Sequence, residues 1–248
     1  MKKIIFLLYV IFIAVLISKL TSIFLFPNYN LGDYWIYHNA IDRYLRNENF
    51  YIEYFGYFPS FFLLAPLVYI GEIYAFFLIV LAFLSFIVLF KIESPNVAIL
   101  IGFLNLLDIF SGNIDFLIFF VVLLCLWRNE NYTIPILLAF ISFKPSVILI
   151  LPYFLYKSKK RYLFIITYGA SWICFNYYFL LHTEYITYFI DYAIPFFSGG
   201  FAYLRYTWLW YVYYYWIKEY YNKKNEIPIL QRTELIFKTE KCINNLFH

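Results

Sequence analysis

The stretch IYAFFLIVLAFLSFIVLF, from Ile73 to Phe90, holds 18 residues without a single charge. A helix that crosses a bilayer needs roughly 20 mostly apolar residues, and similar runs recur along the chain. The other runs are Ile4–Ile17, resumed at Leu20–Phe26, then Phe58–Ile70, Val97–Phe110, Ile114–Trp127, Ile134–Tyr156, Tyr162–Leu181 and Tyr206–Ile217. They predict an all-α integral membrane protein with about eight transmembrane helices, some of them short or broken.

The composition indicates the same class of protein. Hydrophobic residues make up 64% of the chain and charged residues 14%, whereas soluble domains carry about 45–50% apolar and about 25% charged residues. The net charge of +4 resides in loops and the tail, so we expect no nucleic-acid partner. Cys125 and Cys174 lie in apolar runs and Cys242 in the tail, which predicts neither a disulfide framework nor a metal site. We also find no phosphate-binding glycine loop or nucleophile elbow, and we expect no cofactor.

Lysine and arginine positions set the expected orientation, because cytoplasmic loops of membrane proteins are enriched in both. Lys2 and Lys3 precede the first apolar run, and the cluster KSKKR covers 157–161. Both fall inside the cell if the passes alternate from a cytoplasmic N-terminus. We therefore expect a polytopic domain over 1–217 in the plasma membrane, with 27–57 as an outer loop, and a cytoplasmic polar tail over 218–248. For the tail, a surface-lying amphipathic helix and a loosely ordered segment are both open.

The outer loop carries a helical pattern between Asp33 and Arg46. One face is formed by Tyr34, Tyr37, Ile41, Tyr44 and Leu45, and the other by Asn39, Asp42, Arg43 and Arg46. This spacing is typical of an amphipathic helix, and Asp42 and Arg46 stand four residues apart as an ion pair. The pattern predicts a juxtamembrane helix that lies at the outer membrane surface.

Asp33 stands where this helix is expected to begin, and two roles are open to it. As an N-cap, its carboxylate accepts backbone N–H bonds. As a general base, it takes a proton from a substrate hydroxyl and must lie beside that hydroxyl. Tyr37 and His38 follow on the same helix as candidate binding partners, although a lone histidine in a loop is more often simply solvated.

Polar side chains inside the apolar runs form a second group of candidates, because such groups tend to face a bundle interior or a cavity. The stretch NLLDIFSGNID contains Asn105, Asp108, Asn113 and Asp115. A helix-to-helix turn with its caps explains this stretch as well as a functional site does. Lys144 lies deep in the run that Phe143-Lys144-Pro145 is expected to break, and either faces an anionic lipid phosphate or pairs with a buried carboxylate. Arg205 offers the same chemistry.

Three stretches follow one another in a recognisable order. GDYWIYHNAIDRYL resembles an Asp-aromatic-x-x-Tyr segment in a first outer loop, and FGYFPSFFLLAPL resembles a Tyr-Pro-Pro-rich start of a second helix. SGNID, followed by FISFKPSVILILP, resembles a Gly-Gln-x-Asn segment and a Lys-Pro helix. Over residues 1–165 the chain resembles the lipid-linked-sugar mannosyltransferases of the GT-C superfamily, in the group that contains the mycobacterial phosphatidylinositol-mannoside enzymes.

The resemblance implies an inverting transfer of a hexose, with mannose expected, from a polyprenyl- or dolichyl-phosphate donor to an acceptor on the outer face. It implies Asp33 as the general base, donor-phosphate or structural roles for Asn113 and Lys144, and no metal. Tyr37, His38 and Arg205 complete the expected substrate-binding residues. The chain departs from the family in having Asn113 where Gln is usual and one proline in FGYFP where two are common, and family members are commonly longer.

Two other classes of protein stay open. A non-catalytic assembly subunit or lipid-binding scaffold, held by a partner membrane protein, suits the short chain. A lipid or solute transporter would use the intramembrane charges of Asp108 and Lys144, although the internal repeats common in transporters are not visible in the sequence. Lipid-linked sugar and membrane lipid are the expected small partners.

Overall fold

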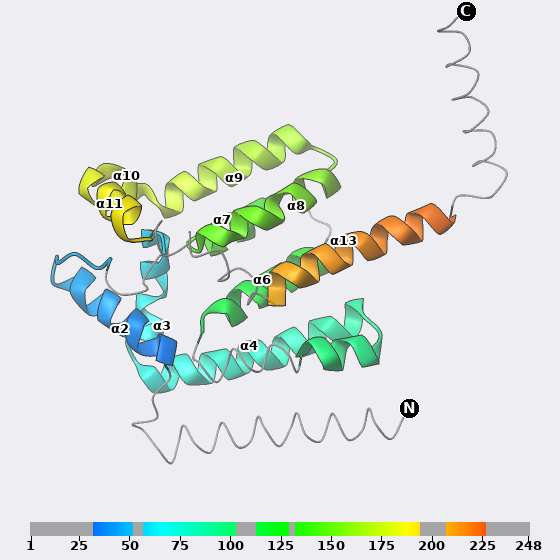
Figure 1. Ribbon diagram of the computed structural model, residues 1–248, viewed down its shortest axis with the longest axis horizontal. Helices are drawn as coiled ribbons and strands as arrows, with labels where there is room; N and C mark the ends of the chain where they lie inside the picture. The colour runs from blue at the N-terminus through cyan, green and yellow to red at the C-terminus, as the bar shows by residue number, and fades with distance from the viewer. Residues whose placement is uncertain (1–31, 52–56, 103–112, 129–131, 194–206, 227–248) are drawn as a thin grey trace, which may run out of the picture. The chain divides into compact units, whose positions relative to one another are not determined.

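The computed structural model describes residues 32–51, 57–102, 113–128, 132–193 and 207–226, and the structural statements below concern these ranges. They form helices and contain no strand, which confirms the expected all-α class (Figure 1). Met1–Leu209 form one compact unit, and a second unit, Trp210–His248, begins within the last described helix.

Helix α4, Gly71–Ile92, contains the uncharged run Ile73–Phe90. Within the described ranges, Ile73–Ile92 is the one segment long and apolar enough to cross a membrane; its 20 residues rise about 30 Å, the thickness of the hydrocarbon core. The helix has no proline, and its only glycine stands at its first position. It ends just before Ser94, since a residue that precedes a proline favours extended backbone.

Three of the expected passes are broken into shorter elements. The run Phe58–Ile70 contains the 3-10 helix η1 (Pro59–Leu64) and α3 (Ala65–Val68). The run Ile134–Tyr156 is divided into α7 (Thr133–Ile141), the 3-10 helix η2 (Pro145–Ile150) and α8 (Leu151–Lys157). The run Tyr162–Leu181 is divided into α9 (Arg161–Phe175) and α10 (Tyr177–Leu181). The first-turn prolines Pro59, Pro66, Pro145 and Pro152 account for most of these new starts, because proline is accepted there and breaks a helix interior. The break expected at Phe143-Lys144-Pro145 is confirmed.

The remaining described segments are also helical. They are residues 95–102, α6 (Asp115–Trp127), α11 (Thr183–Tyr188), the π-helical turn η3 (Phe189–Ala193) and α13 (Thr207–Glu226). Helix α13 runs without a break through the boundary expected between residues 217 and 218 and well past the end of the apolar run Tyr206–Ile217. The first apolar run and the tail beyond residue 226 lie outside the described residues.

The outer-loop helix forms as predicted, as α2, Gly32–Leu45. Tyr37 and Ile41 are buried on its apolar face, and the expected pair forms on the polar face, with Arg46 Nη2 2.6 Å from Asp42 Oδ2. Leu45 is 60% exposed at the last position of the helix, so its assignment to the buried face was wrong. Because α2 begins at Gly32, Asp33 lies inside the first turn and not at the N-cap. In the first turn its negative charge still interacts favourably with the helix dipole.

The helices pack in pairs around an aromatic core. Helix α4 packs against α6 and α7 against α9, while α6 also contacts α7 and α2 contacts α3 (Figure 1). The ring centroid of buried Phe61 lies 5.2 Å from that of Tyr37, 5.3 Å from Tyr57 and 5.7 Å from Phe143. These contacts bring α2, the chain before η1 and the α7–η2 connection to one place.

Candidate functional site

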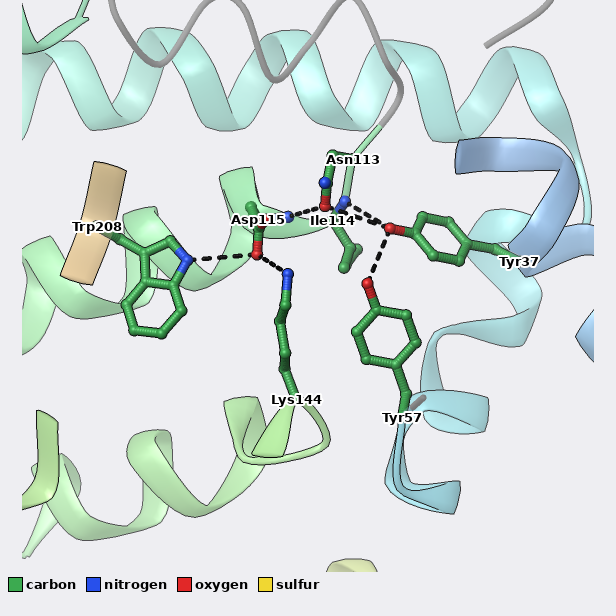
Figure 2. Close-up of polar contacts among 7 residues, drawn as sticks. All are labelled: Tyr37, Tyr57, Asn113, Ile114, Asp115, Lys144 and Trp208. Carbon is green, nitrogen blue, oxygen red and sulfur yellow. Dashed lines mark hydrogen bonds and ion pairs between the residues drawn. The ribbon is translucent and has the colours of Figure 1, made fainter. Parts of the chain in front are cut away.

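Beside this aromatic core lies a group of polar contacts that joins five parts of the chain. We call it the polar cluster, and it consists of Tyr37, Tyr57, Asn113, Ile114, Asp115, Lys144 and Trp208 (Figure 2). All seven residues belong to the first compact unit. They come from α2, the start of η1, the start of α6, the α7–η2 connection and the first turn of α13.

An ion pair between Asp115 and Lys144 forms the centre of the polar cluster. Lys144 Nζ lies 2.5 Å from Asp115 Oδ1, and each side chain is only 4% exposed. The indole Nε1–H of Trp208 donates to the same carboxylate oxygen at 3.3 Å (Figure 2). Burial of either charge alone is costly, so the two neutralise each other.

Local backbone geometry aims Lys144 at this position. The residue precedes Pro145 and takes the extended conformation, with φ −91° and ψ 111°, which the following proline favours. The interruption of the helix releases backbone groups for other partners, and Phe143 O accepts the N–H of Phe58 at 2.7 Å. Lys144 Nζ also lies 5.7 Å from the centroid of the Tyr57 ring, within the range of a cation–π contact.

Asn113 holds the start of α6. Its Oδ1 accepts the backbone N–H of Asp115 at 3.0 Å, the Asx-type contact by which asparagine organises turns and helix starts. The same oxygen accepts the Tyr37 hydroxyl at 3.2 Å. This contact lies one residue before Ile114, the N-cap of α6, and fits the turn alternative for SGNID. Asn105 and Asp108 lie outside the described residues.

Tyr37 connects this turn to α2. Its hydroxyl lies 3.2 Å from that of Tyr57 and accepts the backbone N–H of Ile114 at 3.4 Å. Because the Tyr37 hydroxyl donates to Asn113, the hydrogen between the two tyrosines comes from Tyr57. Burial raises the pKa of Tyr37 well above its ordinary value, and the neighbouring Tyr57, Tyr74 and Asp33 raise it further.

The other predicted site residues lie around or outside the polar cluster. Asp33 is half-buried on α2, and its charge acts on Tyr37. His38 is half-buried, and its ring stacks on that of Tyr69 with a centroid distance of 5.3 Å and an interplanar angle of 16°. Arg205 lies outside the described residues. The structure thus joins Tyr37 to Asn113 directly and Lys144 to Asn113 through Asp115, and the charge of Asp33 acts on Tyr37.

Four members of the polar cluster were not among the predicted site residues. Asp115 was noted in a stretch for which a turn and a functional site were both open, and Tyr57, Ile114 and Trp208 were not singled out. One signal was present, since a lysine deep in an apolar run requires a counter-charge. Nothing in the sequence distinguishes Asp108 from Asp115 in that role, and a tryptophan 93 positions beyond Asp115 gives no local sign of its partner.

The polar cluster combines one carboxylate, one ammonium group, two phenol hydroxyls, one amide and one indole N–H. In the ranges that the structure describes, no group of three or more histidine, cysteine or acidic residues is placed to hold a metal ion. Comparison of the chain with protein-family models finds no match, and comparisons with curated proteins and with solved structures find none either. The function is therefore argued from these contacts and from the motifs.

Proposed function

We propose that the protein is a membrane glycosyltransferase similar to the GT-C mannosyltransferases. It moves a hexose from a polyprenyl- or dolichyl-phosphate donor to an acceptor at the outer face, with Asp33 as the general base. One observation carries the proposal: the three stretches that resemble the family meet at the polar cluster. The outer-loop helix supplies Tyr37, FGYFP supplies Tyr57, and the third stretch supplies Asn113 and Lys144. The Tyr37 hydroxyl lies 3.2 Å from both the Tyr57 hydroxyl and Asn113 Oδ1. Lys144 joins through Asp115, whose N–H donates to Asn113 Oδ1 at 3.0 Å and whose Oδ1 lies 2.5 Å from Lys144 Nζ.

The position of Asp33 fits the role of a base beside this cluster. Asp33 and Tyr37 are separated by one helical turn, so their side chains share a face of α2. Tyr37 stays protonated, because burial and the nearby negative charge disfavour the phenolate. It therefore serves as a hydrogen-bond donor while the carboxylate serves as an acceptor.

The proposed reaction is a single displacement. The acceptor hydroxyl oxygen bonds to the anomeric carbon as the bond from that carbon to the phosphate oxygen breaks, and the bonding electron pair leaves with the phosphate. The hydroxyl proton goes to Asp33. Inversion needs one base and no covalent intermediate, and groups that stabilise the departing phosphate lower the barrier. We assign this last role to Lys144 and Arg205, with Asn113 and His38 as further substrate contacts.

The ion pair gives Lys144 a defined resting state in this proposal. Asp115 neutralises the lysine and holds it in place when no donor is bound. Donor phosphate then competes with Asp115 for the ammonium group, and Trp208 remains as a donor to the released carboxylate. The arrangement keeps a buried cation available without leaving it unpaired.

A multi-pass location in the plasma membrane belongs to the same proposal. Helix α4 matches the thickness of a bilayer. The broken runs fit spans whose irregular backbone is covered by protein or lines a water-filled cavity, the two settings in which such backbone is tolerated at membrane depth. The proposal keeps the cytoplasmic N-terminus and the alternating passes for every expected run except Tyr206–Ile217.

The test compares two acidic residues on the same helix. Asp33→Asn is expected to lower sugar transfer from a polyprenyl-phosphate hexose in isolated membranes by about 10²–10⁴-fold, the usual contribution of general base catalysis. Asp42→Asn, on the polar face of α2, is the matched control and is expected to keep full activity. Equal activity of the Asp33 variant and the unmodified chain would refute the assignment of the base.

A second candidate function is a non-catalytic membrane subunit or scaffold. The observation in its favour is that structural roles account for two of the motif residues, since Asn113 holds the turn before α6 and Lys144 neutralises Asp115. This candidate predicts that the unmodified chain transfers no lipid-linked hexose and co-purifies with another membrane protein. Transfer by the purified chain alone would exclude it.

A further inference from the structure

The exposed face of α13 is lined by aromatic side chains. Its exposed large residues are Trp210, Tyr213, Tyr214, Ile217, Tyr220 and Tyr221, and we call them the aromatic stripe. Counted from Trp210, the other five stand 3, 4, 7, 10 and 11 residues further along, so they occupy one side of the helix. All six belong to the second compact unit, and the stripe is described within that unit alone.

The chemistry of the stripe differs from that of the other long apolar helix. The exposed large residues of α4 are Ile73, Phe76, Val80, Phe83, Leu84, Ile87 and Phe90, and none of them carries a polar atom in its side chain. In the aromatic stripe every residue except Ile217 carries a hydroxyl or an indole N–H at the end of an apolar ring. Plain hydrocarbon surface suits the bilayer interior, whereas Tyr and Trp gather where acyl chains meet headgroups.

The charges of α13 argue against a helix that crosses the bilayer. Its five charged residues are Lys218, Glu219, Lys223, Lys224 and Glu226. The first two stand near its middle, and α13 is not among the segments apolar enough to span. A charge at the centre of a bilayer costs several kcal/mol, and a helix that lies flat avoids this cost because none of its residues reaches the centre. The expected pass Tyr206–Ile217 covers only the first half of this helix.

We propose that α13 lies flat in the headgroup region of an anionic bilayer, with the aromatic stripe facing the acyl chains. Lys223 and Lys224 follow directly on the end of the stripe, where positive charge complements anionic headgroups. The inference does not depend on glycosyl transfer. It removes the eighth pass, so counting passes from the N-terminus no longer assigns a side to the tail.

The test measures the depth of nitroxide labels on the full chain in nanodiscs of phosphatidylcholine and phosphatidylglycerol. Native Cys125, Cys174 and Cys242 are first replaced by alanine, and single cysteines are then introduced by Tyr214→Cys, Ile217→Cys and Tyr221→Cys. Glu219→Cys, opposite the stripe, is the matched control. Collision rates with oxygen, which concentrates in lipid, and with a water-soluble nickel chelate report the depth of each label.

The three stripe labels are expected to favour oxygen over nickel and to report one common depth, about 5–10 Å into the boundary between headgroups and acyl chains. The label at position 219 is expected to favour nickel. A spanning helix would instead separate the depths at positions 214 and 221 by about 10 Å, which would overturn the inference. Stripe labels that collide freely with nickel, or that are shielded from both reagents by a protein partner, would overturn it as well.

A second arm tests the charge of the bilayer. In nanodiscs of phosphatidylcholine alone, and in the variant Lys223→Gln/Lys224→Gln with anionic lipid, the label at position 221 is expected to become more accessible to nickel and to approach the value at position 219. Unchanged accessibility in both cases would show that anionic headgroups have no part in the binding.

Discussion

Removal of one partner from the buried pair Asp115–Lys144 is expected to destabilise the fold strongly. Lys144→Met keeps most of the apolar stem and deletes the charge, so the Asp115 carboxylate keeps the Trp208 hydrogen bond but loses its counter-ion. Asp115→Asn does the reverse and leaves a buried ammonium group. Breaking a buried pair in this way costs about 3–5 kcal/mol, equivalent to roughly 10²–10⁴ in the folding equilibrium constant.

The chain contains a matched control for this measurement. Asp42 and Arg46 form a pair of almost the same length, 2.6 Å against 2.5 Å, but with 33% and 63% of the side chains exposed instead of 4%. Because water screens such a pair, Arg46→Met is expected to cost about 0.2–1 kcal/mol. Burial alone therefore predicts that Lys144→Met lowers the free energy of unfolding by about 2–5 kcal/mol more than Arg46→Met does.

The assay is reversible denaturant unfolding in detergent micelles, followed by tryptophan fluorescence, for each single variant and for Asp115→Asn/Lys144→Met. The double variant is expected to be more stable than either single one, because it leaves no unpaired charge. The reasoning would be refuted if Lys144→Met lowered the free energy of unfolding by no more than Arg46→Met does. It would also be refuted if the loss of stability in the double variant equalled the sum of the losses in Asp115→Asn and Lys144→Met.

Two other substitutions test the packing around the site. Gly71→Ala places a methyl group 3.1 Å from the Tyr34 hydroxyl oxygen and is expected to destabilise the fold by about 1 kcal/mol. Gly169→Ala meets nothing within 4 Å and should stabilise α9 by about 0.5–1 kcal/mol. A change of the same sign in the free energy of unfolding for both variants would contradict this account. Asn176→Leu removes the acceptor of the Ser60 N–H and is expected to cost about 1–3 kcal/mol; a change within the error of the unfolding measurement would show that this bond does not hold η1.

Local patterns in the sequence were enough to locate two elements. Helix α2 follows from the spacing of its apolar residues, and its ion pair follows from the four-residue interval between Asp42 and Arg46. Helix α4 follows from a long run without charge or proline. In both cases neighbours in the sequence supply the decisive interactions, so the pattern is visible without tertiary contacts.

Breaks in the apolar runs were predictable only where proline marks them. Pro145 indicated the break at Lys144, but the break at Asn176 has no proline. There the fully buried amide donates to Trp172 O and accepts the N–H of Ser60, 116 positions away. An asparagine in an apolar run does not reveal such a distant partner.

The helical class, the positions of α2 and α4 and the need of a buried lysine for a counter-charge could all be predicted from local patterns. The packed fold was needed to identify Asp115 as that counter-charge, Trp208 as a second partner of the carboxylate, and Tyr37 as the link from α2 to the same turn. The reason is physical: helix formation depends on residues three and four apart, whereas the choice of a buried partner depends on which helices pack together. That packing is set by the whole aromatic core, which no single stretch of the sequence encodes.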